Sequence, residues 1–96
     1  MLSSTEIETS LKRLKPLLIS MFHVSKLGYF GSYATGQATE ESDVDILVEF
    51  DKPIGWAFFD LQDLLEKELN LKVDLVTLAG LKEKLKPLIL NQTRFV

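Results

Sequence analysis

Cysteine is absent from this 96-residue sequence, which excludes disulfide bonds, thiolate zinc sites and a cysteine nucleophile. No apolar run approaches the roughly 18–20 residues of a membrane-spanning helix. The polar start MLSSTEIETS has none of the features of a signal peptide, and the chain has no linker and no low-complexity tract. We therefore expect one cytoplasmic domain over residues 1–96, with no membrane partner.

An excess of basic residues is also lacking. Eleven Lys and Arg against 14 Asp and Glu give a net charge of −3, which argues against direct nucleic-acid binding. Any bound phosphate must therefore be met locally, by a metal ion or by backbone dipoles. Hydrophobic residues make up 46% of the chain, which is enough for a core without a metal or disulfide.

Hydrophobic periodicity predicts helices that alternate with strands. The expected helices cover residues 7–22, 56–69 and 78–89, and the expected strands cover residues 24–30, 43–50 and 72–77. This order predicts an α/β (α+β) fold, in which a small sheet carries its helices mainly on one face. Ser3 or Thr5, each followed three residues later by a glutamate, is expected to cap the first helix.

Two prolines fall inside the helical patterns. Proline lacks the backbone N–H and clashes with the preceding turn. We therefore expect Pro16 to kink the first helix or to begin a second one, and Pro87 to kink or end the last helix.

Two aspartates, Asp43 and Asp45, share one face of the expected strand 43–50. Residues i and i+2 of a strand point the same way, roughly 6.5–7 Å apart, so these carboxylates can converge on a divalent cation. Hard oxygen ligands of this kind suit Mg²⁺. The opposite face is apolar throughout: Val44, Ile46, Val48 and Phe50. The alternative is that both aspartates are ordinary surface carboxylates at the start of a strand.

Gly31 and Ser32 follow a strand and precede a segment that could form a short helix. Glycine lets the backbone approach a ligand closely, and the first N–H groups of a helix favour phosphate. The segment is not a P-loop, because Gln37 and Ala38 stand where that motif requires Lys and Ser or Thr. The alternative is a simple turn glycine.

A third carboxylate, Asp74, lies between the apolar residues Val73 and Leu75 and so points to the other face of its strand. If strands 43–50 and 72–77 are neighbours, Asp74 joins Asp43 and Asp45. Three carboxylates on one face match a two-metal site, whose ions activate the attacking oxygen and stabilise the leaving group. Taken alone, Asp74 is equally consistent with a polar strand position.

Together these residues resemble a known family. Gly31-Ser32, ten intervening residues and then Asp43-Val44-Asp45 are similar to the G-S-x10-D-x-D signature of minimal nucleotidyltransferases, within the DNA polymerase β-like superfamily. The resemblance extends over nearly the whole chain. It implies a mixed sheet and an enzyme that uses two Mg²⁺ ions and an NTP, with ATP the expected donor.

The resemblance also implies residue roles and a partner. By position, Gly31 and Ser32 resemble the triphosphate-contacting residues, and Asp43, Asp45 and Asp74 resemble the metal ligands. Many members are antitoxins of type VII toxin–antitoxin systems. Some transfer AMP to a tyrosine of a HEPN-domain RNase toxin, so a hetero-oligomer with such a toxin is expected here. Thr35 departs from the family, whose members often have an arginine at this position.

The resemblance favours an Mg²⁺-dependent nucleotidyltransferase that modifies a cognate toxin. A second hypothesis is an antitoxin that neutralises its toxin by binding, with little or no catalysis, which the change at Thr35 would suit. Nucleotidyl transfer to a small molecule is a third, although relatives of that kind usually carry an additional substrate domain. A structural domain without a site is the fourth.

Some other residues have two interpretations. Trp56, Phe58 and Phe59 are expected in the core or in a hydrophobic staple, with base stacking as the alternative. The ring of Tyr33 is expected to contact nucleotide or to fill a gap beside the sheet. His23 is expected to have a structural role near the end of the first helix.

Overall fold

A computed structural model of the chain describes residues 2–96. Its helices are α1 (Ser4–Phe22), α2 (Ser32–Thr35), α3 (Ala57–Leu69) and α4 (Lys86–Gln92), and its strands are β1 (Val24–Phe30), β2 (Val44–Phe50), β3 (Val73–Thr77) and β4 (Arg94–Phe95). The strands form one sheet in the order β3-β2-β1-β4. Strand β1 pairs antiparallel with β2 and β4, whereas β2 pairs parallel with β3, so the sheet is mixed as expected.

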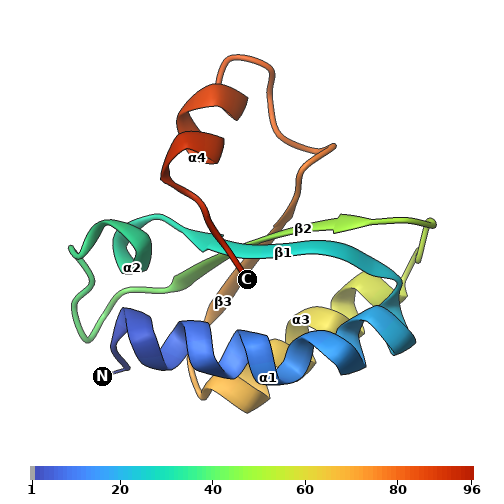
Figure 1. The fold of residues 1–96 in the computed structure, drawn as a ribbon, viewed down its shortest axis with the longest axis horizontal. Helices are drawn as coiled ribbons and strands as arrows, with labels where there is room; N and C mark the ends of the chain where they lie inside the picture. Colours follow the sequence, from blue (N-terminus) through green and yellow to red (C-terminus); the bar gives the residue numbers. More distant parts are fainter. Residues whose placement is uncertain (1) are drawn as a thin grey trace.

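Helices α1 and α3 lie along one face of the sheet, and α4 stands on the other side with the loop that leads to it (Figure 1). The core forms between the layer of two long helices and the sheet, and α1, α3 and the strands all contribute buried apolar residues. These include Ile7, Leu11, Leu14, Leu18, Leu61, Leu65, Val44, Ile46 and Val48. Burying each such side chain stabilises the fold by about 1.5–3 kcal/mol. The predicted arrangement of helices mainly on one face is confirmed.

Helix α1 begins with a capping box at Ser3, one of the two predicted candidates. The Glu6 N–H donates to the Ser3 hydroxyl and the Ser3 N–H donates to the Glu6 carboxylate, both at 3.1 Å. At the other end His23 adopts a left-handed conformation, with φ of 55°, and its N–H donates to the Leu18 carbonyl. His23 therefore ends the helix, in line with the structural role expected for it.

The prediction that Pro16 begins a second helix is wrong, because α1 runs through this residue without a break. Pro16 lies on the exposed side of α1, so water can solvate the Lys12 carbonyl that has lost its intrahelical donor. On the inner side Leu14 and Leu18 are buried in the core and anchor the helix on both sides of Pro16. Tertiary packing here outweighs the intrinsic penalty of an interior proline.

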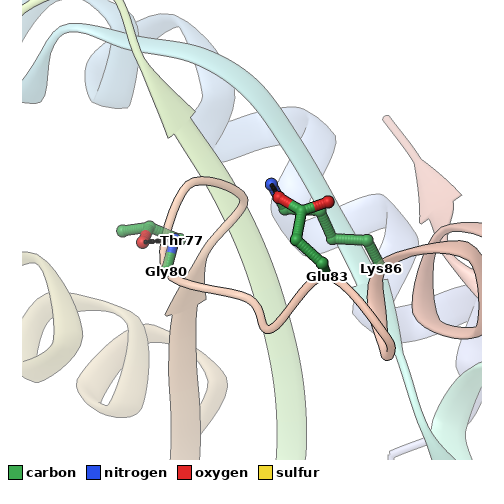
Figure 2. Close-up of polar contacts among 4 residues, drawn as sticks. All are labelled: Thr77, Gly80, Glu83 and Lys86. Carbon is green, nitrogen blue, oxygen red and sulfur yellow. Dashed lines mark hydrogen bonds and ion pairs between the residues drawn. The ribbon is translucent and has the colours of Figure 1, made fainter.

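The prediction of a helix over 78–89 is wrong in its extent. Residues 78–85 form turns, in which the Gly80 N–H donates to the Thr77 hydroxyl at 3.0 Å and Lys86 pairs with Glu83 at 3.1 Å (Figure 2). Helix α4 starts at Lys86, so Pro87 lies in its first turn and neither kinks nor ends it. A proline there loses no hydrogen bond, because the first N–H groups of a helix have no intrahelical acceptor.

Two aromatic side chains expected in the core are on the surface instead. Trp56 is 85% exposed and Phe59 is 54% exposed, with their ring centroids 5.9 Å apart, whereas Phe58 is half-buried against the core. The inner face of α3 is occupied by Leu61, Leu65 and Leu69, which leaves no core position for the first two rings.

None of the helices described within residues 2–96, including the 19-residue α1, combines the length and hydropathy of a membrane span.

Candidate active site

The parallel pairing of β2 and β3 places Asp45 and Asp74 directly opposite each other. On β2, Val44 and Ile46 flank Asp45 and are buried in the core, so the Asp45 side chain points to the sheet face away from α1 and α3. The same alternation turns Asp74 to that face, since its neighbours Val73 and Leu75 are buried. The two carboxylates therefore meet at adjacent strands, as the sequence analysis required.

Asp45 is influenced by the negative charges of the other two predicted aspartates. The pKa of Asp45 is raised from 3.8 to about 6, first by burial, then by the charge of Asp74 and a hydrogen bond with it, and then by the charge of Asp43. Asp43 lies just before β2 and is exposed. Asp43 and Asp74 thus both act on Asp45, and each of these negative charges favours its neutral form.

Gly31 lies against Asp45. Its neighbour Phe30 pairs with Asp45 across β1 and β2. A Cβ atom at Gly31 would lie 2.1 Å from Oδ2 of Asp45, and the residue has a φ of 71°. Both the close approach and the backbone conformation require glycine. The predicted Gly-Ser turn is therefore directly next to the carboxylates.

Ser32 follows as the first residue of α2, a single helical turn anchored on the Gly31 carbonyl. The N–H groups of Ala34 and Thr35 donate to that carbonyl at 3.0 and 3.1 Å, and the Thr35 hydroxyl donates to it at 3.2 Å. Thr35 thus bonds the backbone of the turn and supplies no charge.

Tyr33 has turned inward from the same short helix. It is 1% exposed and belongs to the core, so its ring fills a gap beside the sheet and is not placed to contact nucleotide. Within residues 2–96 its hydroxyl has no hydrogen-bond partner.

The carboxylates do not form a complete metal cage by themselves. Across residues 2–96, no three or more histidine, cysteine, aspartate or glutamate side chains are grouped closely enough to hold a metal ion. The donor set nevertheless fits magnesium. Asp45 and Asp74 are hard oxygen ligands that repel each other, and no cationic side chain lowers the raised pKa of Asp45. Mg²⁺ keeps several waters and is commonly held by one or two carboxylates together with substrate phosphates.

A cavity of about 550 Å³ lies elsewhere, at the opposite ends of β2 and β3 from the aspartates. It is lined by residues 49–53, 77–79 and 86. None of the five predicted site residues lines it, although all five lie within the described part of the chain. The aspartates instead lie at the amino ends of β2 and β3, where Asp43 and Asp74 are exposed and Asp45 is half-buried.

One residue of this region was missed by the sequence analysis. The Gly31 N–H donates to Oε1 of Gln92, at the end of α4, over 2.8 Å. Nothing in the sequence signals this contact, since the two residues are 61 positions apart and Gln92 belongs to no motif.

A family model described as a nucleotidyltransferase domain matches residues 6–96, which include the Gly-Ser turn and all three aspartates. The chain belongs to the nucleotidyltransferase domain family. The predicted resemblance to minimal nucleotidyltransferases is confirmed, and so is the prediction that the chain is an enzyme of this class.

Among its relatives, the chain is 42% identical to a protein adenylyltransferase called MntA from Thermococcus cleftensis, and the match covers 100% of this chain and 98% of the relative. A solved structure of a putative minimal nucleotidyltransferase superposes with a TM-score of 0.83 at 26% identity, over 97% of this chain and 95% of that one. A toxin–antitoxin structure with AMP-PNP superposes with a TM-score of 0.71 at 25% identity, over 98% of this chain and 72% of that one. The fold prediction is therefore confirmed independently of the strand assignments.

Proposed function

We propose that this nucleotidyltransferase is an Mg²⁺-dependent protein adenylyltransferase of one domain, residues 1–96, that acts as a type VII antitoxin. In this proposal it works in the cytoplasm and transfers AMP from ATP to a tyrosine of a HEPN-type RNase toxin with which it forms a hetero-oligomer. The observation that carries the proposal is the register of β2 and β3, which sets Asp74 opposite Asp45 with Gly31 against the Asp45 carboxylate.

Two of the similar proteins support the choice of substrate and partner. The relative at 42% identity is named a protein adenylyltransferase, and the toxin–antitoxin structure with AMP-PNP has 25% identity. The net charge of −3 also suits a protein substrate better than a nucleic acid.

In the proposed site, Asp43, Asp45 and Asp74 would hold two Mg²⁺ ions. Bound metal would supply positive charge against the triphosphate and a lower pKa for the attacking hydroxyl. We expect Gly31 and Ser32 to lie against the triphosphate. The Ser32 hydroxyl and backbone N–H are the donors, because the Gly31 N–H is already bonded to Gln92.

Asp74 lies on β3, which is an edge strand of the sheet, and its side chain is exposed. A tyrosine of a partner protein can therefore approach it from outside. In the reaction the tyrosine oxygen bonds to the α-phosphorus, the bond to the β-phosphate oxygen breaks, and pyrophosphate leaves. In this proposal Asp74 accepts the proton that the tyrosine hydroxyl gives up.

The test is a transfer assay with α-labelled ATP, Mg²⁺ and the product of the neighbouring gene, which this proposal expects to be a HEPN toxin. We expect label on the toxin with the wild-type protein, and a loss of at least 100-fold for Asp45→Asn, since removing a preorganised charged group costs about 10²–10³ in rate. Asp63→Asn is the matched control, because Asp63 is exposed on α3, across the sheet from the site. If toxin stays unlabelled while an active relative labels its own toxin in parallel, the catalytic proposal fails.

A second candidate function is neutralisation by binding alone. Thr35 in place of a family arginine favours it, because threonine supplies no charge for phosphate. The double variant Asp43→Asn/Asp45→Asn separates the two. Neutralisation that persists with undiminished toxin affinity supports binding, whereas lost neutralisation with complex formation intact supports catalysis.

A further inference from the structure

The Gly31 turn is held from two sides. Gly31 has φ of 71° and ψ of −149°, a conformation that residues other than glycine rarely adopt. Its carbonyl accepts from α2, and its N–H donates to the Gln92 side chain at 2.8 Å. The acceptor is unambiguous, because only the amide oxygen of Gln92 can receive a backbone N–H. The turn that abuts Asp45 is thus bonded to the C-terminal end of α4.

Gln92 reaches the turn because the C-terminal segment is fixed against β1. Strand β4 pairs with β1 so that Tyr29 lies opposite Arg94 and Gly28 opposite Phe95. Gly28 makes this approach possible, since a Cβ there would lie 2.8 Å from the Arg94 carbonyl oxygen and 2.9 Å from Cγ2 of Thr93.

Further hydrogen bonds hold the same segment in register. The Val96 N–H donates to the Leu27 carbonyl at 2.9 Å, and the Thr93 hydroxyl donates to the Ile89 carbonyl at 2.6 Å. The end of α4 therefore has a defined position beside β1.

The hydrogen bond between Gln92 and Gly31 is not a by-product of packing Gln92 into the core. None of the seven described residues of α4 is buried, and Leu88, on the same helix, is 62% exposed. Gln92 itself is half-buried, and its described hydrogen bond goes to Gly31. The Gln92 side chain therefore acts on the Gly31 turn, whose N–H it accepts.

We propose that Gln92 is a positioning residue for nucleotide binding. By accepting the Gly31 N–H it holds the turn against Asp45 and presents the Ser32 hydroxyl and N–H to the triphosphate. The effect on nucleotide rests on the function proposed above, whereas the effect on the turn does not. The C-terminal segment, residues 92–95, thereby contributes to the site, although it lies outside the Gly-Ser and aspartate motifs.

The test compares Gln92→Met, which keeps side-chain length and loses the acceptor, with Gln92→Glu, which keeps an acceptor oxygen at the same reach. Asn91→Met is the matched control, because Asn91 is the adjacent exposed amide on α4. The first measurement is hydrogen exchange of the Gly31 amide by NMR. We expect Gln92→Met to exchange about 3- to 10-fold faster than wild type, as for the loss of one hydrogen bond, while Gln92→Glu and Asn91→Met retain protection.

The second measurement is the kinetics of AMP transfer. We expect Gln92→Met to raise KM for ATP by about 3- to 10-fold with a smaller change in kcat, and Asn91→Met to change neither. A general loss of stability would lower the melting temperature and the active fraction and leave KM unchanged.

Three results would overturn the inference: unchanged Gly31 exchange in Gln92→Met, an equal rise of KM in Asn91→Met, or a lower KM in Gln92→Met. The last would mean that Gln92 competes with phosphate for the Gly31 N–H. If wild-type protein binds MgATP in calorimetry but transfers no label, the proposed function fails. The inference then stands if Gln92→Met binds MgATP more weakly than wild type and Asn91→Met does not, and it fails otherwise. If wild-type protein binds no MgATP, both fail.

Discussion

At the scale of single residues, the site depends on how close like charges lie. Asp45 is pressed between Gly31 on one side and Asp74 on the other, and burial and repulsion raise its pKa to about 6. Perturbed carboxylates of this kind are typical of functional sites, where charge is kept ready for a ligand. The burial and repulsion that raise the pKa of Asp45 also affect the stability of the metal-free protein.

Because the pKa of Asp45 is about 6 in the folded protein and 3.8 ordinarily, the folded state binds a proton more readily than the unfolded state between those pH values. The free energy of unfolding of the metal-free protein should therefore fall as pH rises from about 4 to about 6. Asp45→Asn, which resembles the neutral form, should be more stable than wild type at pH 7 and similar to it near pH 4.

Urea unfolding in EDTA across that pH range measures the effect, with Asp63→Asn as the control for losing one carboxylate. A stability difference between Asp45→Asn and wild type that does not change with pH would contradict this account.

At the scale of elements, helix α1 shows packing overriding local propensity. It has a capping box at Ser3 and a continuous buried stripe from Ile7 to Phe22, and it tolerates Pro16 on its exposed side. An interior proline costs a helix about 3 kcal/mol relative to alanine. The buried leucines on either side of Pro16 outweigh that cost.

Pro16→Ala should therefore stabilise the protein. The change restores a donor for the Lys12 carbonyl and removes the ring clash, and the greater freedom of the unfolded chain offsets part of the gain. We expect the free energy of unfolding to rise by about 1–2 kcal/mol, measured by urea denaturation. Ser20→Ala, at another exposed position of α1, controls for helix propensity alone. A destabilised Pro16→Ala would show that the helix requires the proline.

At the scale of the whole molecule, the two faces of the sheet have different roles. One face carries the core under α1 and α3, while the other presents Asp45 and Asp74. A ligand that neutralises the second face can bind without disturbing the first. It should therefore stabilise the fold by mass action.

MgATP should raise the melting temperature of the wild-type protein. At about 100 times its dissociation constant a ligand adds roughly 2.7 kcal/mol to the free energy of unfolding. Asp45→Asn should lose most of this gain, and Asp63→Asn should keep it. Thermal unfolding with ATP alone, Mg²⁺ alone and both together provides the measurement. Equal stabilisation of Asp45→Asn would place the nucleotide away from the aspartates.

Much of this protein could be predicted from its sequence because the deciding signals are local. Alternation in β2 put Asp45 on the face opposite the helices, and the spacing from Gly31-Ser32 to the aspartates pointed to the family. The cap at Ser3 and the buried face of α1 follow from residues three and four apart. Short-range patterns of this kind are present in the chain before it folds.

Other features depended on which segments meet in space. The short strand β4 has no alternation to detect, and Pro87 begins a helix that the leucine pattern extends too far upstream. Trp56 and Phe59 lie outside because the inner face of α3 was already filled. The bond between Gln92 and Gly31 exists only because β4 pairs with β1 beside Gly28. Periodicity in the chain determines which face of an element is buried, whereas contacts between distant segments arise only from the closed sheet.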